Sequence, residues 1–352
     1  MKTLSIKTKL LFLVTMLLFC SRHVQALAEH EKEEGSSHFF SSDPQLDMGE
    51  EWLNKPIRYD QKWAKDADLS LTLDQHLYPA LSSIINRFAL EKGLKIAIKE
   101  GTCGISAGLL SKKHVDIGGF CCPPGKMDRL PGLQYHTLGV AALGILVNTA
   151  NPLNNLSAGE IRELFQGKIK NWSHFPFEEA PNAFQQPVKV IARFHCKQRP
   201  GHWRLILDNE ELYSLRTDEV ASIEDMISGI AGRKGAIGYE VLWNIKHYQA
   251  AEKIKFLQVG GADPSRGADV ASGRYPFYRV YNITSWGAGS GVENAKADAL
   301  VQYILAHIDE VDPNFGLVPA HQLHRAGWGF SGDELISPPP LHHHDGHINR
   351  KP

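Results

Sequence analysis

Strand-like and helix-like segments alternate between about residues 67 and 332, and this alternation constrains the fold more than any other feature of the chain. Residues 69–73 are apolar at alternate positions, as in a strand, and residues 78–90 are apolar at helical spacing, with Gly93 as a stop signal. Such alternation predicts an α/β fold in which helices cover sheets. Further strands are expected at 94–98, 115–117, 139–147, 188–192 and 235–239, and further helices at 105–110, 158–165, 203–207, 223–231 and 296–308.

The N-terminus has the three parts of a secretory signal peptide. Lys2, Lys7 and Lys9 form a basic region, residues 10–19 form a short apolar run, and residues 26–28 (Ala-Leu-Ala) form a small-x-small cleavage site. We therefore expect residues 1–28 to be removed and the mature chain to be exported to the periplasm.

Two alternatives to cleavage after Ala28 remain open. A retained anchor is one, although the apolar run is too short to span a bilayer. A lipoprotein processed at Cys20 is the other, although Phe19 stands where such processing requires a small residue. No second apolar run of 18 residues follows, so we expect no further membrane-spanning segment.

The charge of the chain argues against a nucleic-acid partner. The full sequence has 38 basic and 39 acidic residues, a net charge of −1. Removing residues 1–28 takes away four basic residues and no acidic one, which leaves a net charge of −5. A nucleic-acid-binding protein usually has an excess or a surface patch of basic residues, so we do not expect this chain to bind nucleic acid.

Both ends of the mature chain are expected to lie outside the core. Residues 29–66 are polar and without periodicity, which predicts a flexible leader. Residues 333–352 are rich in proline and histidine, which predicts a disordered tail. The tail histidines could bind a metal weakly; they are His342, His343, His344 and His347.

The glycine-rich segment at residues 101–108 lies between an expected strand and an expected helix. Glycines let the backbone approach a ligand, and the free N–H groups at a helix start favour an anion. A plain turn is the alternative. The segment also matches the G-x-S-x-G pattern of hydrolases, with Ser106 as nucleophile, but only two elements precede it where such enzymes place several strands.

Two later segments carry further signals. Asp116 lies in a short apolar strand that opens into Gly118 and Gly119, and ligands of open α/β sheets bind at strand ends. Residues 151–172 form a turn, a helix and a glycine stop before a tryptophan, with Ser157 and Glu160 spaced as a capping box.

The order of residues in segment 151–172 resembles the Asn-Pro…Leu-Ser…Phe-x-Gly-Lys-Ile-x-Asn-Trp signature of the periplasmic phosphate-binding proteins of ABC importers. These belong to the type II periplasmic solute-binding protein superfamily. Residues 113–119, 144–148 and 235–239 are similar to other elements of that family, and the resemblance extends from about residue 69 to 305.

The resemblance implies a two-lobed fold, in which each lobe is a mixed sheet flanked by helices and two crossing strands join the lobes. Lobe I would contain residues 67–145 and 275–332, and lobe II residues 146–274. It also implies a monomer that binds a small inorganic oxyanion, phosphate or a similar ion, in the cleft, for a membrane permease or a sensor. Neither catalysis nor a cofactor is implied.

The family's ligand residues can be carried over position by position. In the first lobe the matching residues are Thr102, Cys103, Gly104, Ser106 and Asp116, where Asp116 either touches the ligand or braces its loop. In the second lobe Arg193 and Arg199 are the candidate cations, because a guanidinium group suits phosphate geometry; the alternative for each is a surface or salt-bridged arginine. Gly201 and His202 stand where the family has Ser-Gly-Thr, a departure that puts phosphate itself in question.

Four cysteines of the mature chain fall in loops that the resemblance brings to the cleft. They are Cys103, Cys121, Cys122 and Cys196. In an oxidising compartment we expect disulfides, with Cys103 bridged to Cys121 or Cys122. The alternative is a periplasmic metal- or thiol-reactive binding protein on the same fold, with Cys103, Cys121, Cys122, His195 and Cys196 as soft ligands.

Overall fold

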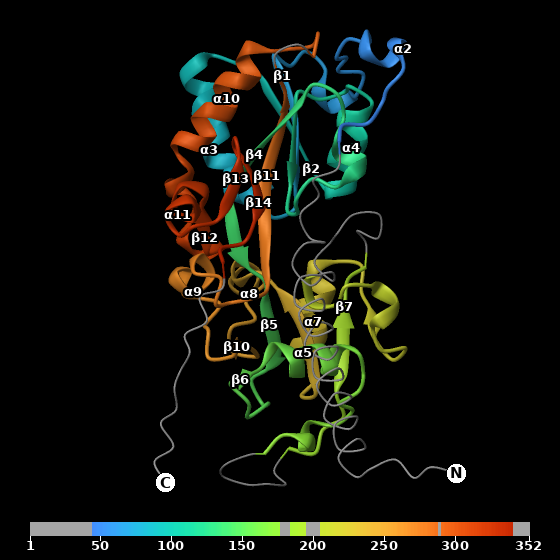
Figure 1. The fold of residues 1–352 in the computed structure, drawn as a ribbon, viewed down its shortest axis with the longest axis vertical. Helices are drawn as coiled ribbons and strands as arrows, with labels where there is room; N and C mark the ends of the chain where they lie inside the picture. The colour runs from blue at the N-terminus through green and yellow to red at the C-terminus, as the bar shows by residue number, and fades with distance from the viewer. Residues whose placement is uncertain (1–43, 177–183, 195–204, 288–289, 341–352) are drawn as a thin grey trace, which may run out of the picture. The chain divides into compact units, whose positions relative to one another are not determined.

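The computed structural model describes residues 44–176, 184–194, 205–287 and 290–340 of the chain (Figure 1). Within these residues it contains two six-stranded sheets and one two-stranded hairpin. Helices flank both sheets, so the expected mixed α/β architecture is confirmed.

The first sheet combines parallel and antiparallel strands. The neighbouring strands β1, β2 and β3 run parallel, with β1 between the other two, and β11 runs antiparallel to both β3 and β4. Helices α3 and α10 pack together on one face and α4 covers the other (Figure 1). The strand order is β12 (Leu317–Pro319), β4 (Leu133–Ala142), β11 (Tyr278–Trp286), β3 (Ile117–Phe120), β1 (Leu69–Asp74), β2 (Ile96–Gly101), and the helices are α3 (Leu77–Lys92), α4 (Cys103–Ser111) and α10 (Ala295–Ala306).

The second sheet has a parallel pair, β7 and β9, next to antiparallel β5 and β10. Its strand order is β6 (Asn155–Leu156), β10 (Ile254–Val259), β5 (Gly144–Asn148), β9 (Ala236–Glu240), β7 (Lys189–Ala192), β8 (Asp218–Glu219). Its helices are α5 (Ala158–Phe165), α7 (Ile223–Ala231) and α8 (Leu242–His247). The shorter remaining elements are α2 (Glu50–Leu53), α9 (Gly267–Ala271), α11 (Ala320–Arg325), β13 (Gly329–Ser331) and β14 (Glu334–Ser337).

Helices α5 and α7 have the bounds that the sequence predicts, because each begins at a serine capping box. Ser157 accepts a hydrogen bond from the Glu160 amide, and Ser222 accepts one from the Asp225 amide. In both helices the acidic side chain in turn accepts a hydrogen bond from the backbone N–H of the serine. Two N–H groups at the helix start therefore have partners.

The chain passes from the first sheet to the second at Leu143. The sequence predicts one buried strand over residues 139–147, whereas the structure divides this run into β4 and β5 on either side of Leu143. The Leu143 amide donates to the Phe277 carbonyl (2.8 Å), which precedes β11 on the return to the first sheet. The expected lobe boundaries at residues 145 and 275 fall beside these two passages.

Two expectations about the ends of the chain are wrong for the described residues: part of the expected flexible leader and part of the expected disordered tail are folded. Residues 44–66 pack against the first sheet: the Trp52 indole donates to the Ser111 carbonyl (2.7 Å), and the Lys113 ammonium lies 4.4 Å from the Trp52 ring centroid. Strand β14 pairs with β13, and the Leu335 amide donates to Thr137 Oγ1 (2.9 Å), so ordered structure continues beyond residue 333. Burial of apolar side chains explains both differences. The tail histidines lie outside the described residues.

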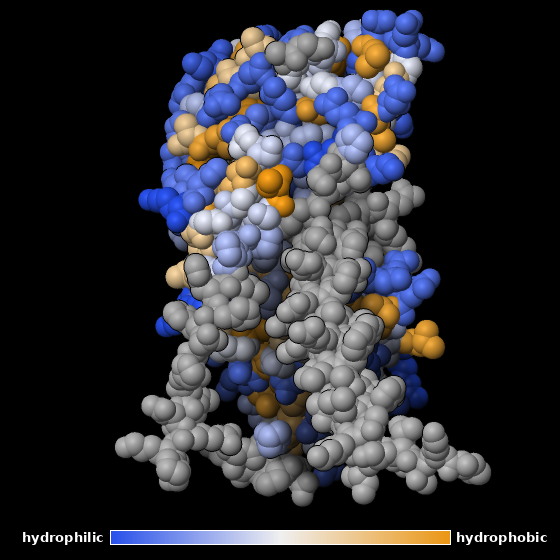
Figure 2. Space-filling view, in the orientation of Figure 1, coloured by the Kyte–Doolittle hydropathy of each residue, from blue (hydrophilic) through white to orange (hydrophobic). Residues whose placement is uncertain are grey.

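Where Figure 2 colours the surface by hydropathy, hydrophilic residues predominate in the upper part, with hydrophobic residues as scattered spots. Such spots are ordinary on proteins in water. Among the described helices, none has both the length and the apolar character that a membrane span requires.

A glycine in β9 sets the distance between the second sheet and α7. A Cβ atom at Gly238 would lie 2.7 Å from Met226 Sδ and 2.8 Å from Ile230 Cδ1. We expect Gly238→Ala to lower the free energy of unfolding by about 1–3 kcal/mol in urea denaturation, because overpacking strains a filled core. The control is Gly159→Ala in α5, where the nearest atom is 3.9 Å away, and a gain of about 0.5–1 kcal/mol is expected there. Equal shifts for both variants would contradict this account.

Candidate functional site

The carboxyl ends of the parallel strands in both sheets carry a connected set of buried polar side chains. Asp74 ends β1, and His76 follows it at the start of α3. Arg193 follows β7, and Glu240 ends β9. All four are almost completely buried. Ligands of open α/β sheets bind at this kind of edge, so the set marks the candidate site.

Glu240 is the centre of this set. Its carboxylate accepts hydrogen bonds from Arg193 (2.8 Å) and from Arg279 of β11 (2.8 Å), and it lies 3.1 Å from His76 Nε2. Burial alone would raise the pKa of Glu240, but Arg279, His76 and Arg193 hold it well below its usual value. The residue is therefore an ionised acid that joins strand ends from both sheets.

Arg193 contacts both sheets. Besides its bond to Glu240, its guanidinium donates to Gln75 Oε1 (3.3 Å), beside β1, and its backbone amide donates to the Tyr239 hydroxyl (3.0 Å). A buried guanidinium in this position is the type of group that recognises oxyanions. The structure thus places the predicted Arg193 at the candidate site.

The glycine-rich segment at residues 101–108 lies at the carboxyl end of β2, as expected, but it is not a loop, because α4 already begins at Cys103. Thr102 caps α4 by accepting from the Ile105 amide (3.3 Å), while Gly104 is exposed. The Ser106 hydroxyl is buried 3.4 Å from that of Thr72. Among the described residues its hydrogen-bond partner is thus a hydroxyl, rather than the imidazole that a hydrolase nucleophile requires.

Asp116 lies at the opposite edge of the first sheet. It precedes β3, and its carboxylate accepts hydrogen bonds from the Ser70 amide (2.9 Å) and from the side chains of Tyr59 and Asn294. Burial, together with the bond to Asp116, raises the pKa of Tyr59. The sequence left open whether Asp116 touches the ligand or braces its loop, and these contacts fit the bracing role.

Cys103, the first residue of α4, and Cys121, which follows β3, lie in contact. Their Sγ atoms are 3.2 Å apart, longer than the roughly 2.05 Å of a disulfide, and Cys103, Cys121 and Cys122 form no disulfide in the described part of the chain. Contacts with Cys103 and Cys122, burial, and the charge of Asp74 all raise the pKa of the Cys121 thiol. The structure therefore contains no bridge among these three cysteines, and the expected disulfide stays a prediction.

Several predicted site residues cannot be placed. Arg199, Gly201, His202, His195 and Cys196 lie outside the described residues. Conversely, four buried residues of the site were not among the residues predicted from the sequence: Asp74, His76, Glu240 and Arg279. Asp74 and Glu240 each come directly after an expected apolar strand, and that position is the signal that could have identified them.

Removing the negative charge of Glu240 should be costly. We expect Glu240→Gln to lower the free energy of unfolding by about 3–5 kcal/mol, because two buried guanidinium groups lose their counter-charge. The control is Glu310→Gln, which removes an exposed pair with Arg87 and should change the free energy of unfolding far less, because solvent screens that pair. Urea denaturation of both variants measures the difference, and similar losses would contradict a central role for Glu240.

Known proteins are similar to this chain in sequence and in fold. The chain is 24% identical to the phosphate-binding protein PstS of Bacillus subtilis over 245 residues, which covers 68% of this chain and 77% of the relative. The crystal structure of an ABC-type phosphate transport receptor from Vibrio cholerae superimposes with a TM-score of 0.56 at 16% identity, covering 75% of this chain and all of that one.

A second solved structure gives the same result. It is described as a phosphate ABC transporter substrate-binding protein with bound phosphate from Clostridium perfringens, and it superimposes with a TM-score of 0.60 at 15% identity. The alignment covers 71% of this chain and 98% of that one. These matches confirm the expected two-lobed type II fold. A family model for the PBP superfamily domain matches residues 61–307, and the chain therefore belongs to that superfamily.

Proposed function

We propose that the chain is an exported solute-binding protein that captures a small inorganic oxyanion between the carboxyl edges of its two sheets. The ion would be phosphate or one like it, and the partner a membrane permease or a sensor. The names of its relatives support this role, since they are phosphate-binding and phosphate-transport proteins. Binding would occur in a monomer and without chemical turnover.

The position of Arg193 is the observation that carries this proposal. Its guanidinium is buried and hydrogen-bonded both to Glu240 of the second sheet and to Gln75 of the first. A planar fork of N–H donors matches the geometry of a phosphate oxygen pair. An anion held here would contact both sheets and would favour the arrangement in which they are close.

The start of α4 would supply the donors of the first sheet. The first amide groups of a helix have no carbonyl partner within it, and the exposed Gly104 leaves room for close approach. Thr102 adds a hydroxyl at this end of the helix. Because Asp74 and Glu240 already place two negative charges nearby, selectivity would depend on the number and direction of donors rather than on net positive charge.

Substitution of Arg193 tests the proposed ligand contact. We expect Arg193→Ala to weaken phosphate binding about 10- to 100-fold in calorimetric titration, which corresponds to the loss of a charged hydrogen bond. Arg193→Lys keeps the charge near Glu240 but loses the fork, so it should also bind more weakly. Arg233→Ala removes an exposed arginine between α7 and β9 and should change binding less than twofold. Unchanged affinity in folded Arg193→Ala would rule out this role.

Export can be tested separately from binding. We expect the mature protein to begin at Glu29, because residues 26–28 fit a signal-peptidase site. N-terminal sequencing of the protein from the periplasmic fraction of an expressing bacterium measures this. Recovery of the uncleaved chain in the membrane fraction would instead support a retained anchor.

A further inference from the structure

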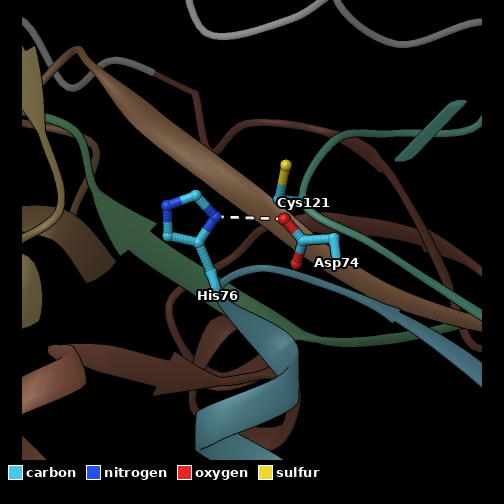
Figure 3. A group of neighbouring side chains, drawn as sticks. All are labelled: Asp74, His76 and Cys121. Carbon is cyan, nitrogen blue, oxygen red and sulfur yellow. Dashed lines mark hydrogen bonds and ion pairs between the residues drawn. The ribbon is translucent and has the colours of Figure 1, made fainter. Parts of the chain in front are cut away.

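Three buried side chains with metal-ligating atoms meet at the carboxyl edge of the first sheet (Figure 3). Asp74 ends β1, His76 precedes α3, and Cys121 follows β3. One ligand atom from each lies within 4.8 Å of the other two. We propose that this Asp–His–Cys cluster is a binding site for a divalent transition metal of the zinc type.

The ligand atoms fit a tetrahedral zinc site in kind and in spacing. Zinc binds carboxylate oxygen, imidazole nitrogen and thiolate sulfur. In an ideal site the nitrogen and oxygen ligand atoms are about 3.3 Å apart. Here His76 Nδ1 lies 3.0 Å from Asp74 Oδ2. The ligand atom of Cys121 lies within 4.8 Å of one from each of the other two residues.

Glu240 provides an independent sign of a metal site. Histidines that bind metals usually donate their other ring N–H to a carboxylate, which fixes the tautomer. His76 Nε2 lies 3.1 Å from Glu240 Oε1, so a proton on Nε2 leaves the Nδ1 lone pair directed at Asp74 Oδ2. Two lone pairs in contact require a cation between them or a second ring proton. A metal ion satisfies this requirement, and an imidazolium is the competing explanation.

The charges around the cluster can accommodate a divalent ion. Arg193 and Arg279 both pair with Glu240, whereas Asp74 lies against His76. A divalent metal displaces the thiol proton of its cysteine ligand, so the Cys121 thiolate and the Asp74 carboxylate supply two negative charges to the ion. Arg279 Nη1 lies 3.2 Å from both ring nitrogens of His76, but the guanidinium is also bonded to Glu240.

This site differs from the soft-ligand set that the sequence suggested. Only Cys121 belongs to both, and Asp74 and His76 are the other two ligands here; His195 and Cys196 lie outside the described residues. The inference does not depend on the proposed oxyanion, because the cluster can bind a metal whether or not an anion occupies the cleft.

Cobalt titration of the full-length chain tests the site. The protein is reduced and stripped with a chelator, and its four tail histidines are replaced by alanine. We expect one equivalent of Co²⁺ to give the near-ultraviolet charge-transfer absorption of thiolate ligands, and Zn²⁺ to abolish it. His76→Gln and Cys121→Ser should each weaken Co²⁺ binding at least tenfold.

Two matched controls are available. His136→Gln removes another buried histidine that lies 2.8 Å from a carboxylate, that of Asp333, and it should keep the cobalt absorption. Cys122→Ser removes the neighbouring buried cysteine and should also keep it. The assignment would be overturned if either control variant lost the cobalt absorption while Cys121→Ser kept it.

A second measurement needs no variant and so does not depend on whether a variant folds. X-ray absorption of the zinc-loaded wild-type chain should show sulfur at about 2.3 Å together with nitrogen or oxygen at about 2.0–2.2 Å. A shell without sulfur, loss of zinc on gel filtration, or a Cys103–Cys121 disulfide in the chain isolated from the periplasm would each overturn the proposal. Phosphate titration of the metal-free protein reports on the oxyanion site independently.

Discussion

The buried carboxylate of Glu240 is the interaction on which the rest of the site depends. It holds Arg193, Arg279 and His76, which come from three separate segments of the chain. A buried charge is tolerated only when it is paired, so the ends of β7, β9 and β11 and the start of α3 must lie close together. The same pairing fixes which groups remain available to a ligand, because each guanidinium already has part of its donor set in use.

Local signals predicted much of the fold. Helices α5 and α7 could be delimited to the residue because each carries its own serine cap and an apolar stripe. The strands were harder to delimit. Strand β3 is expected at residues 115–117 but runs over Ile117–Phe120, because its length depends on pairing with β11, about 160 residues away in the sequence.

The site was predicted less well, for a physical reason. Asp116 and Asp74 are both aspartates beside apolar strands, and only the direction of β1 and β3 shows that they lie at opposite edges of the sheet. The pairing of His76 with Glu240 spans 164 residues and leaves no local pattern. Likewise, β14 adjoins a proline-rich segment, and its docking on Thr137 depends on a contact 198 residues distant.

The passage at Leu143 has a mechanical consequence. A single residue separates β4 from β5, so the chain has no slack between the two sheets. The hydrogen bond from the Leu143 amide to Phe277 ties the outgoing segment to the returning one. Any rotation of one sheet against the other has to be absorbed by a few backbone torsions in two adjacent, cross-linked segments. A movement of one sheet against the other would therefore change the backbone torsions near Leu143 and near Phe277 together.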